Sequence, residues 1–77
     1  MDFDKKVFGE RLRVLRQANS YTLVEVASAL KTDKGTVSNM ENGKKGVSVE
    51  KLCTLADYFD VSIDYLVGRT DKPEVNR

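Results

Sequence analysis

The sequence predicts an all-α fold, a single small domain of five helices, and three observations lead to this prediction. The chain has 77 residues with 40% apolar side chains, which suffices for one core that buries roughly 60% of the unfolded surface. Its single cysteine, Cys53, excludes an intrachain disulfide. Apolar residues recur at helical spacing behind polar residues of the kind that cap helices. A compact helical bundle is the economical fold for this composition.

The first helix should begin near Asp2 or Asp4 and end near Ala18, where Asn19 and Ser20 break the pattern. Three apolar residues at a spacing of four and then three would face the core, namely Phe8, Leu12 and Leu15.

The second helix should follow Thr22, which forms a T-x-x-E capping box with Glu25. Tyr21 and Val26 occupy the two positions of a hydrophobic staple around this cap. The helix should be short and end at Leu30.

Only residues 31–33 separate this helix from a third, which Asp33 should cap and which Asn42 and Gly43 should end. Two short helices joined by three or four residues have the spacing of a helix-turn-helix, whose helices cross at a steep angle.

A fourth helix should follow Ser48 and a short fifth helix should follow Ser62 and end at Gly68. Their expected core residues are Leu52, Leu55, Ala56, Phe59, Ile63 and Leu66. We therefore expect a domain of residues 1–68, followed by a polar, frayed tail of residues 69–77.

The charges are unevenly distributed along the chain. Residues 5–45 carry nine basic and four acidic side chains, a net charge of +5, whereas residues 46–77 carry a net charge of −2. The basic half contains the third helix. This uneven charge favours an anionic partner on the side of the third helix and disfavours binding of phosphate on the other side.

Several classes of function are excluded by composition. The chain contains no histidine, which rules out zinc sites of Cys/His type and histidine-based catalysis. No stretch resembles a secretory signal or a membrane span. We expect a protein of the reducing cytoplasm without cofactor, metal or evident small-molecule ligand, and we expect Cys53 to pack in or beside the core.

The third helix is the strongest candidate for function. Helical spacing places Lys34, Gly35, Ser38 and Asn39 on one face, while Val37, Met40 and Glu41 turn away from it. A small, polar, lightly charged face suits a helix that reads bases in a DNA major groove, where the methyl group of Thr36 would meet a thymine methyl. The alternative is a polar-faced helix that only packs on its neighbours.

The segment after this helix is basic. Lys44 and Lys45 lie between two glycines, and we expect them to contact phosphate, as we do for Thr22 at the start of the second helix. The alternative is an ordinary solvated loop.

Two further expectations concern structure and self-association. Glu41 leans inward, and because a buried carboxylate needs a partner, we expect an ion pair with Arg16. Three residues lie off the main apolar stripe and are either boundary residues or a dimer interface, namely Tyr58, Tyr65 and Val67.

These residues together resemble the lambda-repressor-like, Xre-type (Cro/CI-type) helix-turn-helix regulators. The resemblance covers residues 8–68 and rests on the capping box, on TVSNMENGKK and on SVEKLCTLADYFDVSIDYLVG. It implies a five-helix fold whose second and third helices read DNA, and a dimeric regulator, often a repressor of phage, mobile-element or stress genes. It also implies base contacts by the named face of the third helix, phosphate contacts by Asn42, Lys44 and Lys45, and the Arg16–Glu41 pair.

The chain departs from the family pattern at two informative positions. Leu23 stands where the family usually has a glutamine that contacts phosphate, and Lys31 replaces the usual glycine of the turn. A non-glycine residue must then adopt a left-handed conformation. Other departures are Thr32, Val47 and Asp60.

Our main hypothesis is a sequence-specific regulator of double-stranded DNA, of bacterial or phage origin and acting at the nucleoid, that binds a palindromic operator as a homodimer. One reading helix covers too few base pairs to select a single genomic site, and two half-sites about 34 Å apart solve this. The alternative is an adaptor or antitoxin-like module with weak DNA binding, favoured by Leu23 and the small net charge. An enzyme is the weakest hypothesis, because no nucleophile–base pair or metal cluster can be assembled.

Overall fold

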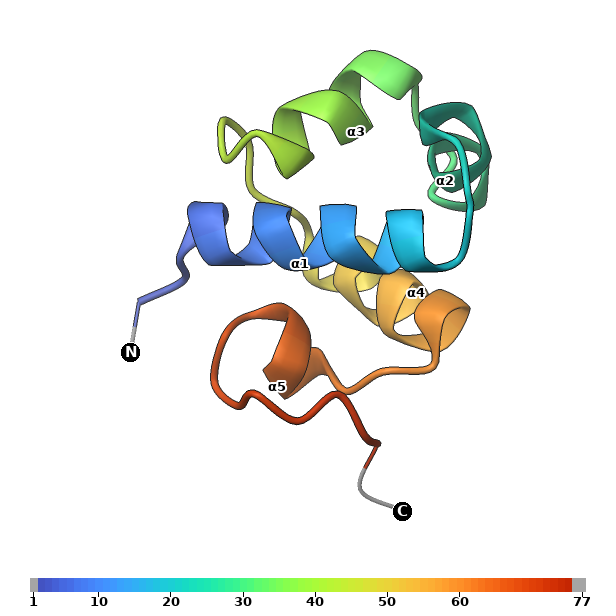
Figure 1. Ribbon diagram of the computed structural model, residues 1–77. Helices are drawn as coiled ribbons and strands as arrows, with labels where there is room; N and C mark the ends of the chain where they lie inside the picture. Colours follow the sequence, from blue (N-terminus) through green and yellow to red (C-terminus); the bar gives the residue numbers. More distant parts are fainter. Residues whose placement is uncertain (1, 76–77) are drawn as a thin grey trace.

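The computed structural model describes residues 2–75 and contains five α-helices (Figure 1). They are α1 (Lys5–Ala18), α2 (Leu23–Ala29), α3 (Lys34–Glu41), α4 (Val49–Phe59) and α5 (Ile63–Leu66). No strand occurs in this part of the chain. The predicted all-α fold and all five helices are confirmed.

Every helix begins at a side-chain cap, as the sequence predicts. In each case a side-chain oxygen accepts a hydrogen bond from a backbone N–H of the first turn, which otherwise lacks a partner. The capping residues are Asp4, Thr22, Asp33, Ser48 and Ser62. The capping box is complete, because the Thr22 N–H also donates to Glu25 Oε1 at 2.9 Å.

Every helix also ends in the same backbone motif, in which a residue with positive φ follows the last turn. At the end of α2, Lys31 N donates to Ser28 O and Thr32 N donates to Ala27 O, the two bonds of a Schellman motif. The five positive-φ residues are Ser20, Lys31, Gly43, Asp60 and Gly68. The left-handed conformation expected for Lys31 is therefore confirmed, at a φ of 55°.

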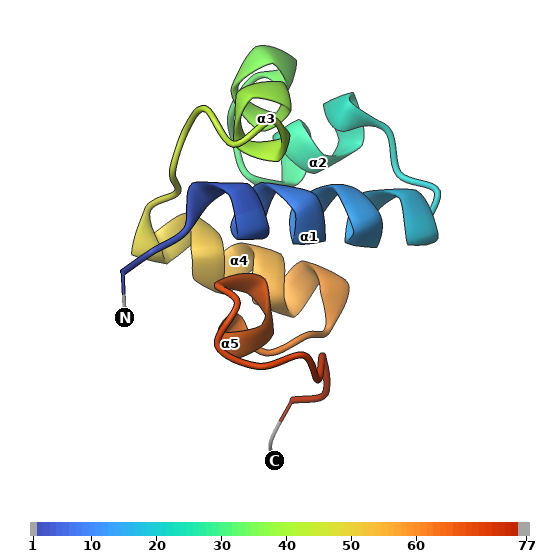
Figure 2. The same ribbon diagram turned by 60° about the vertical axis from the view of Figure 1, so that its left-hand side comes forward.

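Helix α1 forms the middle of the molecule, with α2 and α3 on one side and α4 and α5 on the other (Figures 1 and 2). A single core joins both sides, with seven side chains almost fully buried: Phe8, Leu12, Val26, Val37, Met40, Leu55 and Leu66. Three expected core residues are peripheral, since Leu15 and Leu52 are half-buried and Ile63 is 39% exposed.

The expectation that Cys53 packs in or beside the core is wrong, because Cys53 is exposed. Leu52, Leu55 and Phe59 turn one face of α4 inward, and Cys53 shares the opposite face with the exposed Asp57.

A glycine in α1 brings this helix against the last turn of α3. A Cβ added to Gly9 would lie 2.7 Å from the carbonyl oxygen of Glu41, and it would overlap the carbonyl oxygen of Met40 still more. Real Cβ atoms do not approach backbone so closely, so the two helix backbones can meet only because residue 9 lacks a side chain.

The segment after α5 returns toward α1, although we expected it to fray. Arg11 donates hydrogen bonds to the carbonyl oxygens of Tyr65 and Thr70 and forms an ion pair with Asp71 at 3.0 Å. Farther along, Ser62 N donates to Pro73 O at 2.9 Å. Together these contacts hold residues 70–73 along the bundle.

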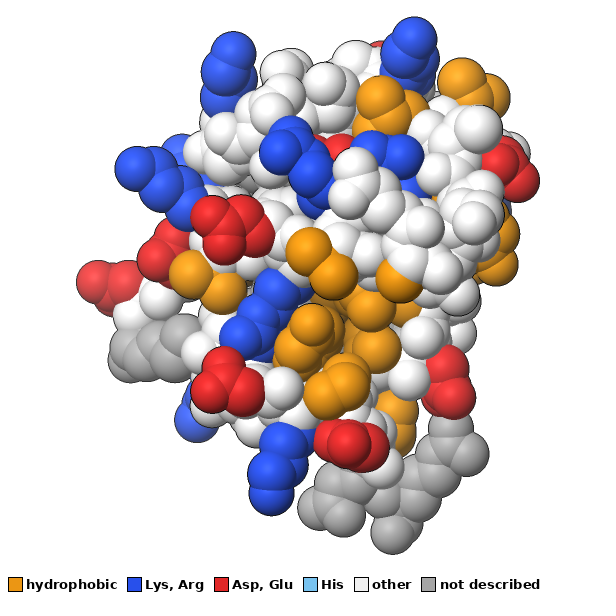
Figure 3. Space-filling view, in the orientation of Figure 1, with side chains coloured by type: hydrophobic (Ala, Val, Ile, Leu, Met, Phe, Trp, Pro, Cys, Tyr) orange, Lys and Arg blue, Asp and Glu red, His pale blue; other side chains and the backbone are white. Residues whose placement is uncertain are grey.

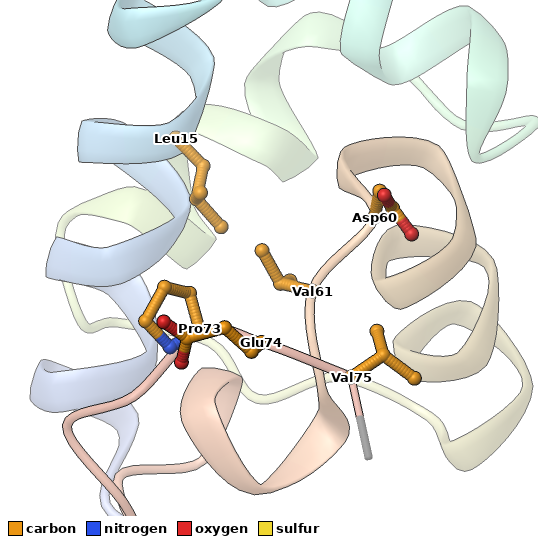
Figure 4. A pocket seen from close by; sticks show the side chains of 6 residues that line it. All are labelled: Leu15, Asp60, Val61, Pro73, Glu74 and Val75. Carbon is orange, nitrogen blue, oxygen red and sulfur yellow. The ribbon is translucent and has the colours of Figure 1, made fainter. Parts of the chain in front are cut away.

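This returning segment borders a shallow hollow on the side of the bundle opposite α3 (Figure 4). Leu15 and Val61 point toward each other across it, Pro73 lies on one side, and Val75 lies at its edge.

Candidate nucleic-acid interface

Helix α3 packs against the core by its inner side, which leaves its outer face exposed. Val37, Met40 and Glu41 are at most 6% exposed, whereas Lys34, Gly35 and Asn39 are exposed. The structure therefore brings these three predicted base-reading residues together on the surface.

The other two predicted base-reading residues are partly covered. Thr36 and Ser38 are half-buried, and Ser38 Oγ lies 3.5 Å from Asn42 Nδ2. They border the exposed face of α3 rather than standing out from it.

The start of α3 is fixed by Asp33, whose carboxylate accepts a hydrogen bond from Thr36 N at 2.7 Å. This bond lowers the pKa of Asp33, and the Thr36 hydroxyl and the positive charge of Lys45 act in the same direction. The cap therefore stays ionised at neutral pH.

The end of α3 is tied to α1 by the expected Arg16–Glu41 ion pair. Arg16 Nε donates to Glu41 Oε2 at 2.6 Å and Arg16 Nη2 donates to Glu41 Oε1 at 3.0 Å. Arg16 Nη1 also donates to the carbonyl oxygen of Tyr21 at 3.1 Å. The bonds to Glu41 raise the pKa of Arg16 despite its partial burial. This two-pronged geometry fixes both distance and orientation between the two helices.

Arg13 is a residue of the site that our sequence interpretation missed. Its Nη2 donates to Asn42 Oδ1 at 2.7 Å, and its Nε lies 3.5 Å from Glu41 Oε1. Residues 9, 13 and 16 follow one another at spacings of four and three and therefore share one face of α1. That spacing was the available signal, and it places Arg13 beside the end of α3.

The basic loop after α3 is also exposed. The structure leaves Lys44 and Lys45 accessible, and Lys44 N closes the helix end by donating to Asn39 O at 2.9 Å. Lys6 of α1 lies against Gly43, since a Cβ added there would be 3.2 Å from Lys6 Cγ. Basic side chains from two segments thus border this end of α3, and Figure 3 shows Lys and Arg side chains gathered in this upper part of the molecule.

The start of α2 offers fewer groups for binding. Thr22 is exposed, but its hydroxyl already accepts a hydrogen bond from Glu25 N at 3.1 Å. Leu23 is half-buried and packs against the core. It supplies no polar group at the position where the family pattern has a glutamine.

Two of the three residues considered for self-association contact other side chains of the chain, and the third is half-buried. Tyr58 stacks on Tyr21 with ring centroids 4.9 Å apart, and burial raises its pKa. The guanidinium of Arg11 lies 4.3 Å from the ring centroid of Tyr65. Val67 is half-buried. None of the three stands alone on an open patch.

Residues 2–75 contain no cluster of three or more side chains suited to hold a metal ion. Within the same residues, no helix combines the length and apolar character needed to cross a membrane.

Comparison with known proteins places this arrangement among helix-turn-helix proteins. A family model described as helix-turn-helix matches residues 12–66. The HTH-type transcriptional regulator YobD of Bacillus subtilis is 35% identical over 68 residues, which are 88% of this chain and 61% of that protein. This chain thus spans about three fifths of the length of that curated relative, and 54% of another, ImmR of the same organism.

Two solved structures share the fold. The restriction-modification controller protein C.AhdI of Aeromonas hydrophila has a TM-score of 0.73 and 32% identity, and the match covers 82% of this chain and 96% of that one. The P22 c2 repressor, solved in complex with a synthetic operator, has a TM-score of 0.75, with 79% of this chain and 92% of that chain covered. At 23% identity, the second match bears on the fold alone.

Proposed function

Because this chain belongs to the lambda-repressor-like (Xre-type) helix-turn-helix family, we propose that it is a sequence-specific, double-stranded DNA-binding transcriptional regulator of the repressor type. The observation that carries the proposal is the mounting of α3. Its inner side is locked by burial and by the Arg16–Glu41 pair, while Lys34, Gly35 and Asn39 form an exposed outer face.

In this proposal α3 enters the major groove and its exposed side chains read base edges. The Asn39 amide offers a paired donor and acceptor that match adenine, and Lys34 reaches guanine acceptors or a phosphate. Gly35 lets the helix backbone approach the DNA closely, and Thr36 and Ser38 contribute from the border of the face.

The basic end of α3 would hold the DNA backbone without reading sequence. Lys44 and Lys45 supply charge, while Asn42 and Thr22 supply hydrogen-bonding groups. Lysine contacts of this kind release counterions from DNA, so affinity should fall steeply with salt.

We further propose that two copies bind a palindromic operator. The half-sites would be one helical turn apart, about 34 Å, so that two α3 helices enter successive major grooves. Tyr58, Tyr65 and Val67, on and beside α4 and α5, remain our proposed dimer contacts. Helices α4 and α5 lie on the other side of α1 from α3, which leaves the α3 side free for DNA (Figure 1).

Leu23 favours the second candidate function, an adaptor or antitoxin-like module with weak DNA binding. With leucine in place of the family's glutamine, the start of α2 has one DNA contact fewer and one apolar side chain more. An enzyme receives no support from the family.

Fluorescence anisotropy against a duplex selected from a random pool, and against a scrambled duplex, distinguishes the two. We expect binding that weakens steeply with salt, Asn39→Ala to reduce the preference for the selected duplex, and Lys44→Ala to weaken both duplexes alike. Lys72→Ala, which removes one exposed positive charge from the segment after α5, is the matched control for Lys44→Ala. Failure of selection to enrich any duplex would favour the adaptor.

A further inference from the structure

Asn42 has a side chain whose two ends are chemically opposite, and its neighbour distinguishes them. The guanidinium of Arg13 has only donors, and its Nη2 lies 2.7 Å from Asn42 Oδ1. A flipped amide would place Nδ2 against those donors, so that two N–H groups would face each other. Arg13 therefore selects one of the two amide orientations.

The selected orientation leaves Asn42 Nδ2 available to an outside acceptor. Its contact inside the chain is with Ser38 Oγ at 3.5 Å, which is long for a hydrogen bond. Asn42 is exposed. Phosphate oxygens only accept hydrogen bonds, so an outward Nδ2 attracts phosphate whereas an outward Oδ1 would repel it.

Arg13 is itself held in place by the end of α3. Its Nε lies 3.5 Å from Glu41 Oε1, and the Glu41 side chain is 3% exposed and immobilised by Arg16. The absence of a side chain at Gly9 lets this part of α1 approach the last turn of α3. The orientation of Asn42 is thus set by a side chain of α1 that is itself held by the end of α3.

We infer that Arg13 is a positioning residue, which orients the Asn42 amide so that Nδ2 donates to a DNA phosphate. The inference rests on the proposed DNA-binding function and adds a residue through which that function acts. Arg13 could instead contact a phosphate directly through its own charge. The double-mutant cycle described next distinguishes this role from the positioning role.

The test is a double-mutant cycle of Arg13→Met and Asn42→Ala, because methionine keeps the unbranched stem of the arginine. Binding is measured by anisotropy on the selected duplex, and each variant is checked by thermal unfolding. Asn42→Ala should weaken binding roughly tenfold, as expected for one hydrogen bond to a charged group. Arg13→Met should weaken it similarly in the wild-type background and only about twofold in the Asn42→Ala background. Lys72→Ala controls for the loss of one positive charge.

Equal losses from Arg13→Met in both backgrounds would overturn the inference in favour of a direct charge contact. No loss in the wild-type background would overturn it as well.

A second measurement needs no DNA and keeps the inference testable by itself. The Asn42 side-chain amide should be well ordered by ¹⁵N NMR relaxation in the wild type and should become mobile in Arg13→Met. In Lys72→Ala it should remain ordered. An unchanged amide in Arg13→Met would refute the positioning role even if DNA binding were weakened. Absence of any DNA binding by the wild type, with the amide behaving as expected, would instead defeat the proposed function while leaving the geometry intact.

Discussion

Arg16 of α1 donates two hydrogen bonds, of 2.6 and 3.0 Å, to the carboxylate of Glu41 of α3, which lies 25 residues away in the sequence. The carboxylate is 3% exposed and the arginine side chain 16% exposed. The orientation of the proposed reading helix therefore depends on a residue of the first helix.

We predict that Arg16→Met destabilises the fold by about 2–3 kcal/mol, because it leaves a buried carboxylate without its main partner. Arg13, 3.5 Å away, keeps the loss at or below the lower end of the range of about 3–5 kcal/mol for a broken buried pair. Urea unfolding monitored by circular dichroism measures the change. The double variant Arg16→Met/Glu41→Leu should recover to within about 1 kcal/mol of the wild type, since it removes both charges. A double variant as unstable as the single one would contradict this.

Gly9→Ala should destabilise the protein by about 1–3 kcal/mol despite the better helix propensity of alanine, because its methyl group overlaps the α3 backbone. The new Cβ would lie 2.7 Å from Glu41 O. Thermal unfolding measures the effect, with the exposed Ala18→Gly in the last turn of α1 as a gauge of propensity alone. A stabilised Gly9→Ala variant would show that α1 and α3 can move apart without cost.

Gly35→Ala should raise the stability of the fold but lower its affinity for DNA. A Cβ at this position meets only Asp33 Oδ1, at 3.5 Å, so the variant should gain roughly 0.5–1 kcal/mol from helix propensity. DNA affinity should nevertheless fall, because the methyl group holds the helix away from the groove. Anisotropy and thermal unfolding are measured on the same samples, with Thr54→Ala on α4 as control. Unchanged affinity would remove Gly35 from the proposed interface.

Lys31→Gly should stabilise the fold by about 0.5–1 kcal/mol. Glycine releases the strain of the left-handed conformation, which is of order 1–2 kcal/mol. This gain exceeds the free energy lost because glycine makes the unfolded chain more flexible. Ser20→Gly, at the equivalent end of α1 with a φ of 58°, should behave alike and leaves the charge unchanged. Lys31→Ala is the control, and it should give no gain because alanine keeps the Cβ. Equal melting temperatures for the glycine and alanine variants would show that the left-handed conformation of Lys31 is not strained.

The Asp33 cap should fail in acid. The pKa of Asp33 is lowered in the folded protein from its ordinary value of 3.8, so its contribution is fully present above that value. It is lost as the pH falls through the lower folded pKa. Asp33→Asn keeps a capping oxygen that does not titrate. The stability of the wild type relative to Asp33→Asn should therefore decline below about pH 4, as measured by urea unfolding at several pH values. A difference that does not vary with pH would show that the carboxylate charge is immaterial to the cap.

Local features of this fold could be read from the sequence because they depend on residues a few positions apart. Thr22 and Glu25 complete a capping box within one turn, and Gly43 ends α3 through bonds to the preceding turn. The Arg16–Glu41 pair could be expected for a different reason, namely the high cost of an unpaired buried carboxylate.

Residues whose neighbours are distant in sequence were harder to predict. Cys53 lies one residue from the core stripe, and its exposure follows from how α4 is rotated in the bundle. The return of residues 70–73 depends on Arg11, whose reach toward the chain end is set by the position of α5.

The sequence alone therefore determined the five helices, their caps, the glycines that end α3 and α5, and the polar outer face of α3, because interactions within one or two turns fix these features. The tertiary structure alone decided that Arg13 contacts the end of α3. The close crossing at Gly9 sets the distance and angle between α1 and α3, and this geometry places Arg13 against Asn42. No local pattern predicts that angle, because it results from the packing of two helices that are far apart in the sequence.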